Sequence, residues 1–161
     1  LIKMSIPTIN PEFKVVLNPD LNSIDWDYVI SLFYKIEWKH RLAEEITLAF
    51  KMSTTTIFIF KEDQIIAFGR VVGDGRYYAM LADIVVDPDF QGQGLGKYLV
   101  TSLNNELVNY HFVNLLFLFH NYDKILLLTY NFYFQRLHLI MFCQIFHKNV
   151  PLYVLGILYL Q

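Results

Sequence analysis

A glycine-rich loop between an apolar strand and an amphipathic helix is the feature that most constrains this sequence. The apolar run 84–86 is followed by Asp87-Pro88-Asp89, where proline, which cannot donate to a sheet, ends the strand. Alternate glycines in the segment 92–96 then lead into leucines that recur every fourth residue from Leu95 to Leu107, a helical spacing. Glycine permits backbone conformations that are closed to other residues. The sequence therefore predicts a strand, a tight loop and a helix in direct succession.

The start of this helix is suited to binding a phosphate or pyrophosphate. Its first N–H groups have no partner within the helix, and the positive end of the helix dipole lies there. Lys97 adds a cation. A Walker loop does not match, because Gln91 and Tyr98 replace the required glycine and hydroxyl residue. A Rossmann fingerprint does not match either, because the third glycine comes one residue too early and the loop follows antiparallel strands.

The residues before the loop predict a strand, two helices and a three-stranded antiparallel meander. The first helix is expected to begin at Ser23 as N-cap. Helical periodicity and β-branched or aromatic runs support the other elements. The expected elements are a strand at 13–17, two helices whose apolar positions fall within 28–36 and 42–50, and strands at 55–60, 65–72 and 77–86.

The composition changes near Glu106. Of 13 basic and 15 acidic side chains, four follow that residue: Asp123, Lys124, Arg136 and Lys148. A membrane anchor needs about 18 consecutive apolar residues. The uncharged runs 107–122, 125–135, 137–147 and 149–161 are all shorter, so no stable membrane insertion is expected. Two explanations remain open: a divergent, very apolar end of the same domain, or a gene-model artefact. The second is suggested because Phe, Tyr, Leu, Ile, Asn and Lys make up 37 of the 55 residues 107–161, and A/T-rich codons specify most of these residue types.

Overall charge and cysteine content exclude several functions. The length of 161 residues favours one domain, and the formal charge of −2 provides no basic field for nucleic acid. The single cysteine, Cys143, excludes an internal disulfide, and the five histidines show no paired metal-ligand spacing, so no metal is expected. No secretory leader is recognisable, which predicts a cytoplasmic protein.

The segment Gln91-x-x-Gly94-x-Gly96 resembles the acetyl-CoA loop of the GNAT superfamily of N-acetyltransferases, with the hallmark Gln/Arg-x-x-Gly-x-Gly/Ala. The preceding Val-Val-x-Pro and the order of elements are also similar to that family. The resemblance implies a GNAT-like acyl-CoA N-acyltransferase fold of the α+β (α/β) class, with a mixed, mostly antiparallel central sheet flanked by helices. It divides the chain into an N-terminal extension (1–12), an acetyl-CoA-binding core (13–108) and an atypical apolar C-terminal segment (109–161).

The resemblance implies an enzyme that transfers an acetyl group from acetyl-CoA to a primary amine by direct attack. A small-molecule amine or an amino sugar phosphate is favoured over a protein amine, because the segment 69–75 is similar to the corresponding segment of family members that acetylate small amines. The alternative is a non-catalytic acyl-CoA-binding or interaction module with a degenerate C-terminal half. Whether the chain forms a homodimer is left open.

The resemblance also assigns candidate site residues. The backbone of the strand would pair with the pantetheine arm, and the loop would surround the pyrophosphate. Asp83 is a candidate general base, because desolvation strengthens a carboxylate as a proton acceptor; an ion pair at the sheet is the alternative. The cofactor-binding residues implied are Ile84, Val85, Val86, Gln91, Gly92, Gln93, Gly94, Leu95, Gly96 and Lys97.

A second candidate catalytic residue lies in the apolar tail. The segment 133–139 is weakly similar to the Phe-Tyr-x-Lys-Leu-Gly-Phe box of the family, whose tyrosine often protonates the departing thiolate. Phe134 stands in the place of that tyrosine and His138 in the place of the glycine, so Tyr133 is the candidate acid, with a core aromatic as the alternative. Residues Glu37, His40, Glu44 and Glu45 are expected near the acceptor or on a solvated helix face.

Overall fold

The computed structural model describes residues 3–38 and 40–107 and, beyond them, the backbone of four strands. The helices are α1 (Trp26–Lys35), α2 (Ala43–Lys51) and α3 (Leu95–Glu106), with 3-10 turns η1 (Leu21–Ser23) and η2 (Pro88–Phe90). The strands are β1 (Phe13–Leu17), β2 (Thr55–Lys61), β3 (Gln64–Gly73), β4 (Tyr78–Val86), β5 (Phe112–Asn121), β6 (Lys124–Asn131), β7 (Leu139–His147) and β8 (Val150–Leu158). The predicted order of elements up to α3 is confirmed.

The start of the first helix differs from the prediction. Asp25, not Ser23, is the N-cap of α1, and its carboxylate accepts a hydrogen bond of 3.0 Å from the N–H of Tyr28. Ser23 ends the preceding turn η1, where its hydroxyl donates to the carbonyl of Asp20. A carboxylate at a helix N-terminus also interacts favourably with the helix dipole, which favours Asp25 as the cap.

The sheet is mixed and mostly antiparallel, as predicted. Six strands lie in the order β1-β2-β3-β4-β5-β6, and all neighbours are antiparallel except β4 and β5, which are parallel. Strands β7 and β8 form a separate antiparallel pair. Strand β5 lies beside β4, and β6 pairs with the other edge of β5. Beyond residue 107, the described part of the chain contains strands and no helix.

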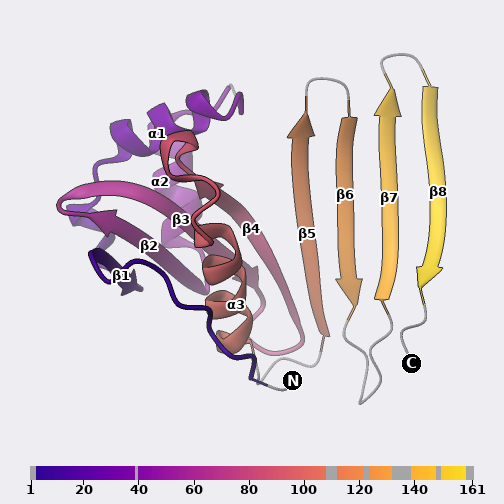
Figure 1. Ribbon diagram of the computed structural model, residues 1–161, viewed down its shortest axis with the longest axis horizontal. Helices are drawn as coiled ribbons and strands as arrows, with labels where there is room; N and C mark the ends of the chain where they lie inside the picture. The colour runs from indigo at the N-terminus through magenta and orange to yellow at the C-terminus, as the bar shows by residue number, and fades with distance from the viewer. Residues whose placement is uncertain are drawn as a thin grey trace.

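Helices cover both faces of the strands β1 to β4 (Figure 1). On one face, the α3 leucines Leu95, Leu99 and Leu103 pack with strand residues such as Ile57 and Leu81. On the other face, side chains of α1 and α2 pack against an aromatic group that contains Phe58 and Phe68. None of the helices in the described residues has the length and apolar character needed to cross a bilayer.

The segment before β1 packs along α3. The N–H of Met4 donates to Oδ1 of Asn105 at 2.8 Å, and Nδ2 of Asn105 donates to the carbonyl of Met4 at 2.9 Å. Ile9 packs against the core under α3. The stretch assigned to an N-terminal extension is thus tied to the helix that follows the glycine loop.

A β-bulge interrupts strand β4 at Asp83. Phe68 pairs with Val85 and Arg70 with Ala82, so two residues of β4 lie opposite the single Gly69 of β3. Asp83 adopts a left-handed conformation with φ of 48°. The extra residue changes which face the following side chains occupy. Leu81 packs on the α3 side, whereas Val85, four residues later, packs on the α1 and α2 side.

Candidate active site

One large cavity connects β4, the glycine loop and the chain between α1 and α2. It has a volume of about 860 Å³, within the usual range for small-molecule sites. Nine of the ten predicted cofactor-binding residues line it, and Gln93 does not. Those nine are Ile84, Val85, Val86, Gln91, Gly92, Gly94, Leu95, Gly96 and Lys97.

The wall formed by β4 has an edge without a strand partner. The pairing of β4 with β5 extends only from Tyr78 to Leu81, where it meets residues 112–115. Beyond that point the two strands diverge (Figure 1). Among the described residues, no strand therefore pairs with the side of β4 that faces away from β3 over 82–86. Backbone groups on that edge are available to an extended ligand, apart from the carbonyl of Val86, which accepts from the Gln91 side chain.

The glycine loop gives the cavity an anion-binding wall. Gly92 and Gly94 have left-handed φ angles of 76° and 81°, and Gly94 is the N-cap of α3. A Cβ atom added at either residue would meet no atom within 4 Å, so both glycines face open space. The N–H of Tyr98 makes the first helical hydrogen bond, to Gly94. The amides of 95–97 precede it and have no acceptor within the helix, which suits an anion.

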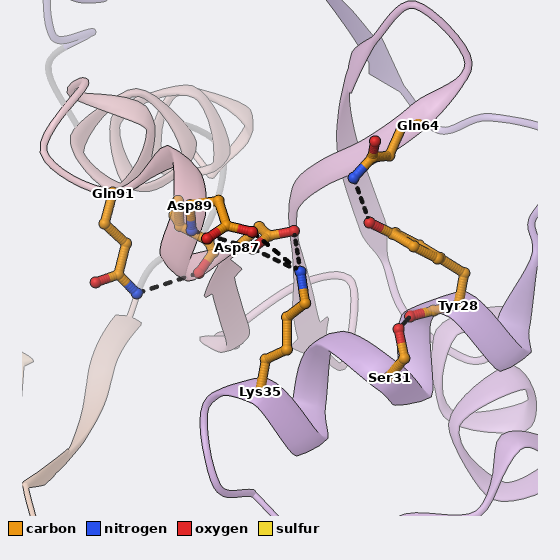
Figure 2. A network of polar contacts seen from close by, with 8 residues as sticks. Tyr28, Ser31, Lys35, Gln64, Asp87, Asp89 and Gln91 are labelled. Carbon is orange, nitrogen blue, oxygen red and sulfur yellow. Dashed lines mark hydrogen bonds and ion pairs between the residues drawn. The ribbon is translucent and has the colours of Figure 1, made fainter.

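The turn before the glycine loop is held by Asp87, whose side chain is completely buried. Its carboxylate accepts from the N–H of Asp89 at 3.1 Å and from the Lys35 ammonium at 2.9 and 3.1 Å (Figure 2). The Asp87 N–H donates to the carbonyl of Ile66. The hydrogen bond to Asp87 raises the pKa of Lys35 above its ordinary value. These contacts fix the end of β4 relative to α1 and β3.

Gln91 makes a further contact with the end of β4 at the same turn. Its side-chain amide donates to the carbonyl of Val86 at 3.3 Å (Figure 2). Gln91 lines the cavity at the same time. This side chain therefore connects the last residue of β4 to the loop expected to surround a pyrophosphate.

Asp83 lies in the cavity wall between two arginines. Its Oδ2 is 2.6 Å from Nε of Arg70, and its Oδ1 is 3.2 Å from Nη2 of Arg41. The side chain is 6% exposed. This is the ion-paired arrangement named as the alternative to a general base. Because each oxygen already has a cationic partner, accepting a proton would require the loss of an ion pair, and the role as base stays a prediction.

The two arginines were not predicted as site residues. Arg70 follows Gly69 on β3, and Arg41 lies between α1 and α2 with its guanidinium 5.0 Å from the ring centre of Phe33 and 5.6 Å from that of Trp38. Both arginines and Trp38 line the cavity. The signal available in the sequence was an arginine three residues after a tryptophan in a short connection, which is too weak to identify a site.

Other predicted residues are placed away from the cavity or outside the described residues. Glu37, His40, Glu44 and Glu45 are not among the lining residues. Tyr133, Phe134 and His138 lie outside the described residues. Within the described residues, no group of three or more His, Cys, Asp or Glu side chains is placed to hold a metal ion.

Comparison with known proteins identifies the family. The sequence model described as "Acetyltransferase (GNAT) domain" matches residues 53–136, about half of the chain. The chain belongs to the GNAT acetyltransferase family. The matched segment contains the bulged strand, the glycine loop and α3, so the GNAT resemblance of the loop is confirmed.

The curated relatives are GNAT proteins from algae and plants. The chain is 34% identical over 88 residues to the "Uncharacterized N-acetyltransferase ycf52" of Gracilaria tenuistipitata var. liui, a match covering 52% of this chain and 48% of that protein. It is 30% identical over 94 residues to "GCN5-related N-acetyltransferase 1, chloroplastic" of Arabidopsis thaliana, covering 57% and 48%. The match thus spans about half the length of each relative.

Solved structures share the GNAT fold. A probable acetyltransferase from methicillin-resistant Staphylococcus aureus superposes with a TM-score of 0.57 at 20% identity, covering 68% of this chain and 81% of that one. A GNAT family acetyltransferase from Elizabethkingia anophelis, solved with acetyl-CoA bound, has a TM-score of 0.50 at 15% identity, covering 68% and 67%. The fold class predicted from the sequence is therefore confirmed.

Proposed function

We propose that this GNAT chain binds acetyl-CoA in the cavity and transfers the acetyl group to a primary amine. The observation that carries the proposal is that one cavity joins the unpaired edge of β4 to the open glycine loop. An extended pantetheine arm requires the first feature and a pyrophosphate requires the second. The GNAT structure from Elizabethkingia anophelis, whose ligand is acetyl-CoA, supports the same assignment.

The residues present fit this ligand. The amides of 95–97 and the Lys97 side chain would hold the pyrophosphate, and the open sides of Gly92 and Gly94 leave space for it. Backbone groups of 84–86 would hold the arm. Acetyl-CoA supplies an acetyl group activated as a thioester. The ten cofactor-binding assignments made from the sequence remain proposals, and Gln93 is the least supported because it does not line the cavity.

The chain's own contribution to transfer is to position the acceptor and to assist charge and proton movement. The C–N bond forms as the C–S bond breaks, and a proton moves from the amine towards the thiolate, so no covalent intermediate with the protein is needed. A backbone N–H of β4 near Val85 would stabilise charge on the carbonyl oxygen. Asp83 and Tyr133 remain the proposed base and acid. Glu37, His40, Glu44 and Glu45 are given no role.

The acceptor is proposed to be a small-molecule amine, including an amino sugar phosphate, because the cavity is bounded by Trp38 and Arg41 beyond β4. The two Arabidopsis thaliana relatives are named chloroplastic; the cytoplasmic location predicted for this chain stays a prediction.

A binding experiment tests the acetyl-CoA site. Ligand at about 100 times its dissociation constant should add about 2.7 kcal/mol to the free energy of unfolding. Gly94→Trp should abolish the effect, because the indole would fill the open side of the loop. Gly75→Trp is a matched control, since Gly75 also has a left-handed φ, of 76°, and open space around its Cβ position, but lies in the β3–β4 turn. A wild-type chain unaffected by acetyl-CoA would refute the proposal.

A turnover experiment separates the enzyme from the alternative module. Release of free CoA thiol is followed with a panel of primary amines, on the wild-type chain and on Gly94→Trp. Amine-dependent release by the wild type alone supports the transferase. Acetyl-CoA binding without release for any amine supports the non-catalytic acyl-CoA-binding module instead.

A further inference from the structure

Two arginines share one carboxylate in the cavity wall. Asp83 accepts a hydrogen bond from Nε of Arg70 through Oδ2, and its Oδ1 forms an ion pair with Nη2 of Arg41. Among the residues that line the cavity, Asp83 is the sole carboxylate, whereas Arg41, Arg70 and Lys97 are cations. Lys97 belongs to α3 and the glycine loop, so its charge is directed to the pyrophosphate. Within the described residues, the two arginines and Asp83 together carry one uncompensated positive charge on the other side of the sheet.

Arg70 makes several contacts within the protein itself. Besides its ion pair, its Nη1 donates to the carbonyl of Ala49 at 3.3 Å and to the hydroxyl of Ser53 at 3.2 Å. Its guanidinium lies 5.5 Å from the ring centre of Phe50, and the side chain is 15% exposed. Arg70 therefore connects β4 to α2 and holds Asp83 in place.

Arg41 has donors left over. It contacts Asp83 through Nη2, and within the described residues Asp83 is its one ionic partner. Its side chain is 34% exposed, and its guanidinium is held beside the rings of Phe33 and Trp38. Stacking on aromatic rings orients the planar guanidinium and lowers the entropy lost when an anion binds. A guanidinium carries five N–H donors in a geometry that matches carboxylate or phosphate.

We infer that the acceptor amine carries an acidic group, a carboxylate or a phosphate monoester, that binds Arg41. This inference rests on the proposed function and specifies the acceptor of the same site. An amine enters largely as an ammonium ion, which the uncompensated charge at Arg41 would repel. An acidic group on the acceptor compensates that charge and anchors the molecule next to the unpaired edge of β4. The acceptor is then selected by charge as well as by size.

Pairs of acceptors that differ in one charge test the inference. An aminoalkyl carboxylate is compared with its carboxamide, and an aminoalkyl phosphate with the corresponding amino alcohol, by kcat/KM from CoA thiol release. The charged member of at least one pair should exceed the neutral member by about tenfold or more, as expected for a charge-assisted contact. The pair with the larger ratio distinguishes a carboxylate from a phosphate acceptor. Equal kcat/KM within both pairs would overturn the inference.

Variants of Arg41 assign the preference to this residue. Arg41→Met should reduce the ratio to about one without changing the KM for acetyl-CoA, and Arg41→Lys should retain part of it, because the charge remains but the planar fork is lost. Arg76→Met is the matched control, since Arg76 is exposed in the β3–β4 turn and does not line the cavity. An unchanged ratio in both Arg41 variants would also overturn the inference.

A binding measurement keeps the test independent of turnover. Isothermal titration of the N-acetylated carboxylate and phosphate, and of their neutral counterparts, is carried out on the full chain with CoA present. At least one charged product should bind about tenfold more tightly or better, and this difference should disappear in Arg41→Met. If no amine is acetylated but the Arg41-dependent binding is observed, the proposed acetyl transfer fails, whereas the recognition of an acidic group by Arg41 stands. If neutral and charged products bind equally, the inference fails.

Discussion

Nζ of Lys35 lies 2.9 Å from Oδ2 of Asp87, a side chain with no exposed surface. The two residues are 52 positions apart in the sequence, so the ion pair connects the last turn of α1 to the turn that follows β4. That turn leads directly into the glycine loop. This ion pair therefore contributes to fixing the position of the loop relative to α1.

Removing the ammonium should destabilise the fold. Lys35→Met leaves the buried Asp87 carboxylate without its counter-ion; because Lys35 is 41% exposed, we expect a loss of about 1–3 kcal/mol, below that of a fully buried pair. Urea unfolding measures it. Lys51→Met, in the last turn of α2, should change the unfolding free energy much less. Combining Lys35→Met with Asp87→Asn should recover part of the loss, since no buried charge remains.

The same ion pair predicts loss of stability at alkaline pH. The hydrogen bond that Lys35 donates to Asp87 raises the pKa of Lys35 above its ordinary 10.5. A raised folded-state pKa gives stability that is complete below the unfolded value and is lost as the pH rises through the folded value. The unfolding free energies of wild type and Lys35→Met should therefore converge above pH 10.5. A difference that stays constant through this range would contradict the assignment.

Replacing each of two loop glycines by alanine should change the free energy of unfolding in opposite directions. Gly94→Ala forces a side chain into a left-handed conformation, and we expect a loss of about 1–2 kcal/mol. Gly96 lies in the first turn of α3, and its added Cβ would stand 3.9 Å from Cγ2 of Val86, an ordinary contact. Gly96→Ala should therefore gain about 0.5–1 kcal/mol through helix propensity. Denaturant midpoints compare the two, and a shift in the same direction for both would refute this account.

Gly69 should be coupled to Ile84 across the bulge. A Cβ atom at Gly69 would lie 2.6 Å from Cδ1 of Ile84 and 3.2 Å from Cδ1 of Leu103. We expect Gly69→Ala to cost about 1–3 kcal/mol by overpacking. Ile84→Val removes the closest atom, so the double variant should be more stable than the sum of the single changes predicts. Strict additivity in a double-mutant cycle would show that this contact is not the cause.

The β3–β4 turn should weaken in acid. The Asp74 carboxylate accepts backbone hydrogen bonds from Tyr78, Arg76 and Tyr77, which lower its pKa below the ordinary 3.8. A lowered folded-state pKa gives stability that is present above the unfolded value and is lost as the pH falls through the folded value. Asp74→Ala should therefore differ from wild type near neutral pH and approach it below pH 3.8. Asp63→Ala, in the β2–β3 turn, is the control.

Local patterns were sufficient to predict most of the folded core. The leucine spacing from Leu95 to Leu107 predicted α3, and Pro88 correctly marked the end of β4. The alternate glycines predicted the loop wall of the cavity, because left-handed backbone and close approach are properties of glycine itself. These features depend on residues that are neighbours in the sequence.

The part of the cavity where the acceptor is proposed to bind depends on contacts between residues that are far apart in the sequence. Asp83 lies in the cavity wall next to residues 84–86, but its partners Arg41 and Arg70 come from different parts of the chain. No periodicity marks a residue that pairs across two layers, since an arginine looks the same in the sequence whether it is solvated or ion-paired. The N-cap of α1 was misassigned to Ser23, because Ser23 and Asp25 offer the same capping chemistry and stand only two residues apart.

The bulge in β4 determines what the deletion of one residue from this strand would do. With two residues opposite Gly69, Val85 faces the α1 and α2 layer although Leu81 faces α3. Deleting Ile84 alone would leave Val85 three positions after Leu81, which in a regular strand still directs it to the α1 and α2 layer. Asp83, however, would then stand two positions after Leu81, so its carboxylate would face the apolar α3 layer and lose both arginines. The extra residue is therefore what allows one strand to place a carboxylate in the cavity wall while its leucine packs beneath α3.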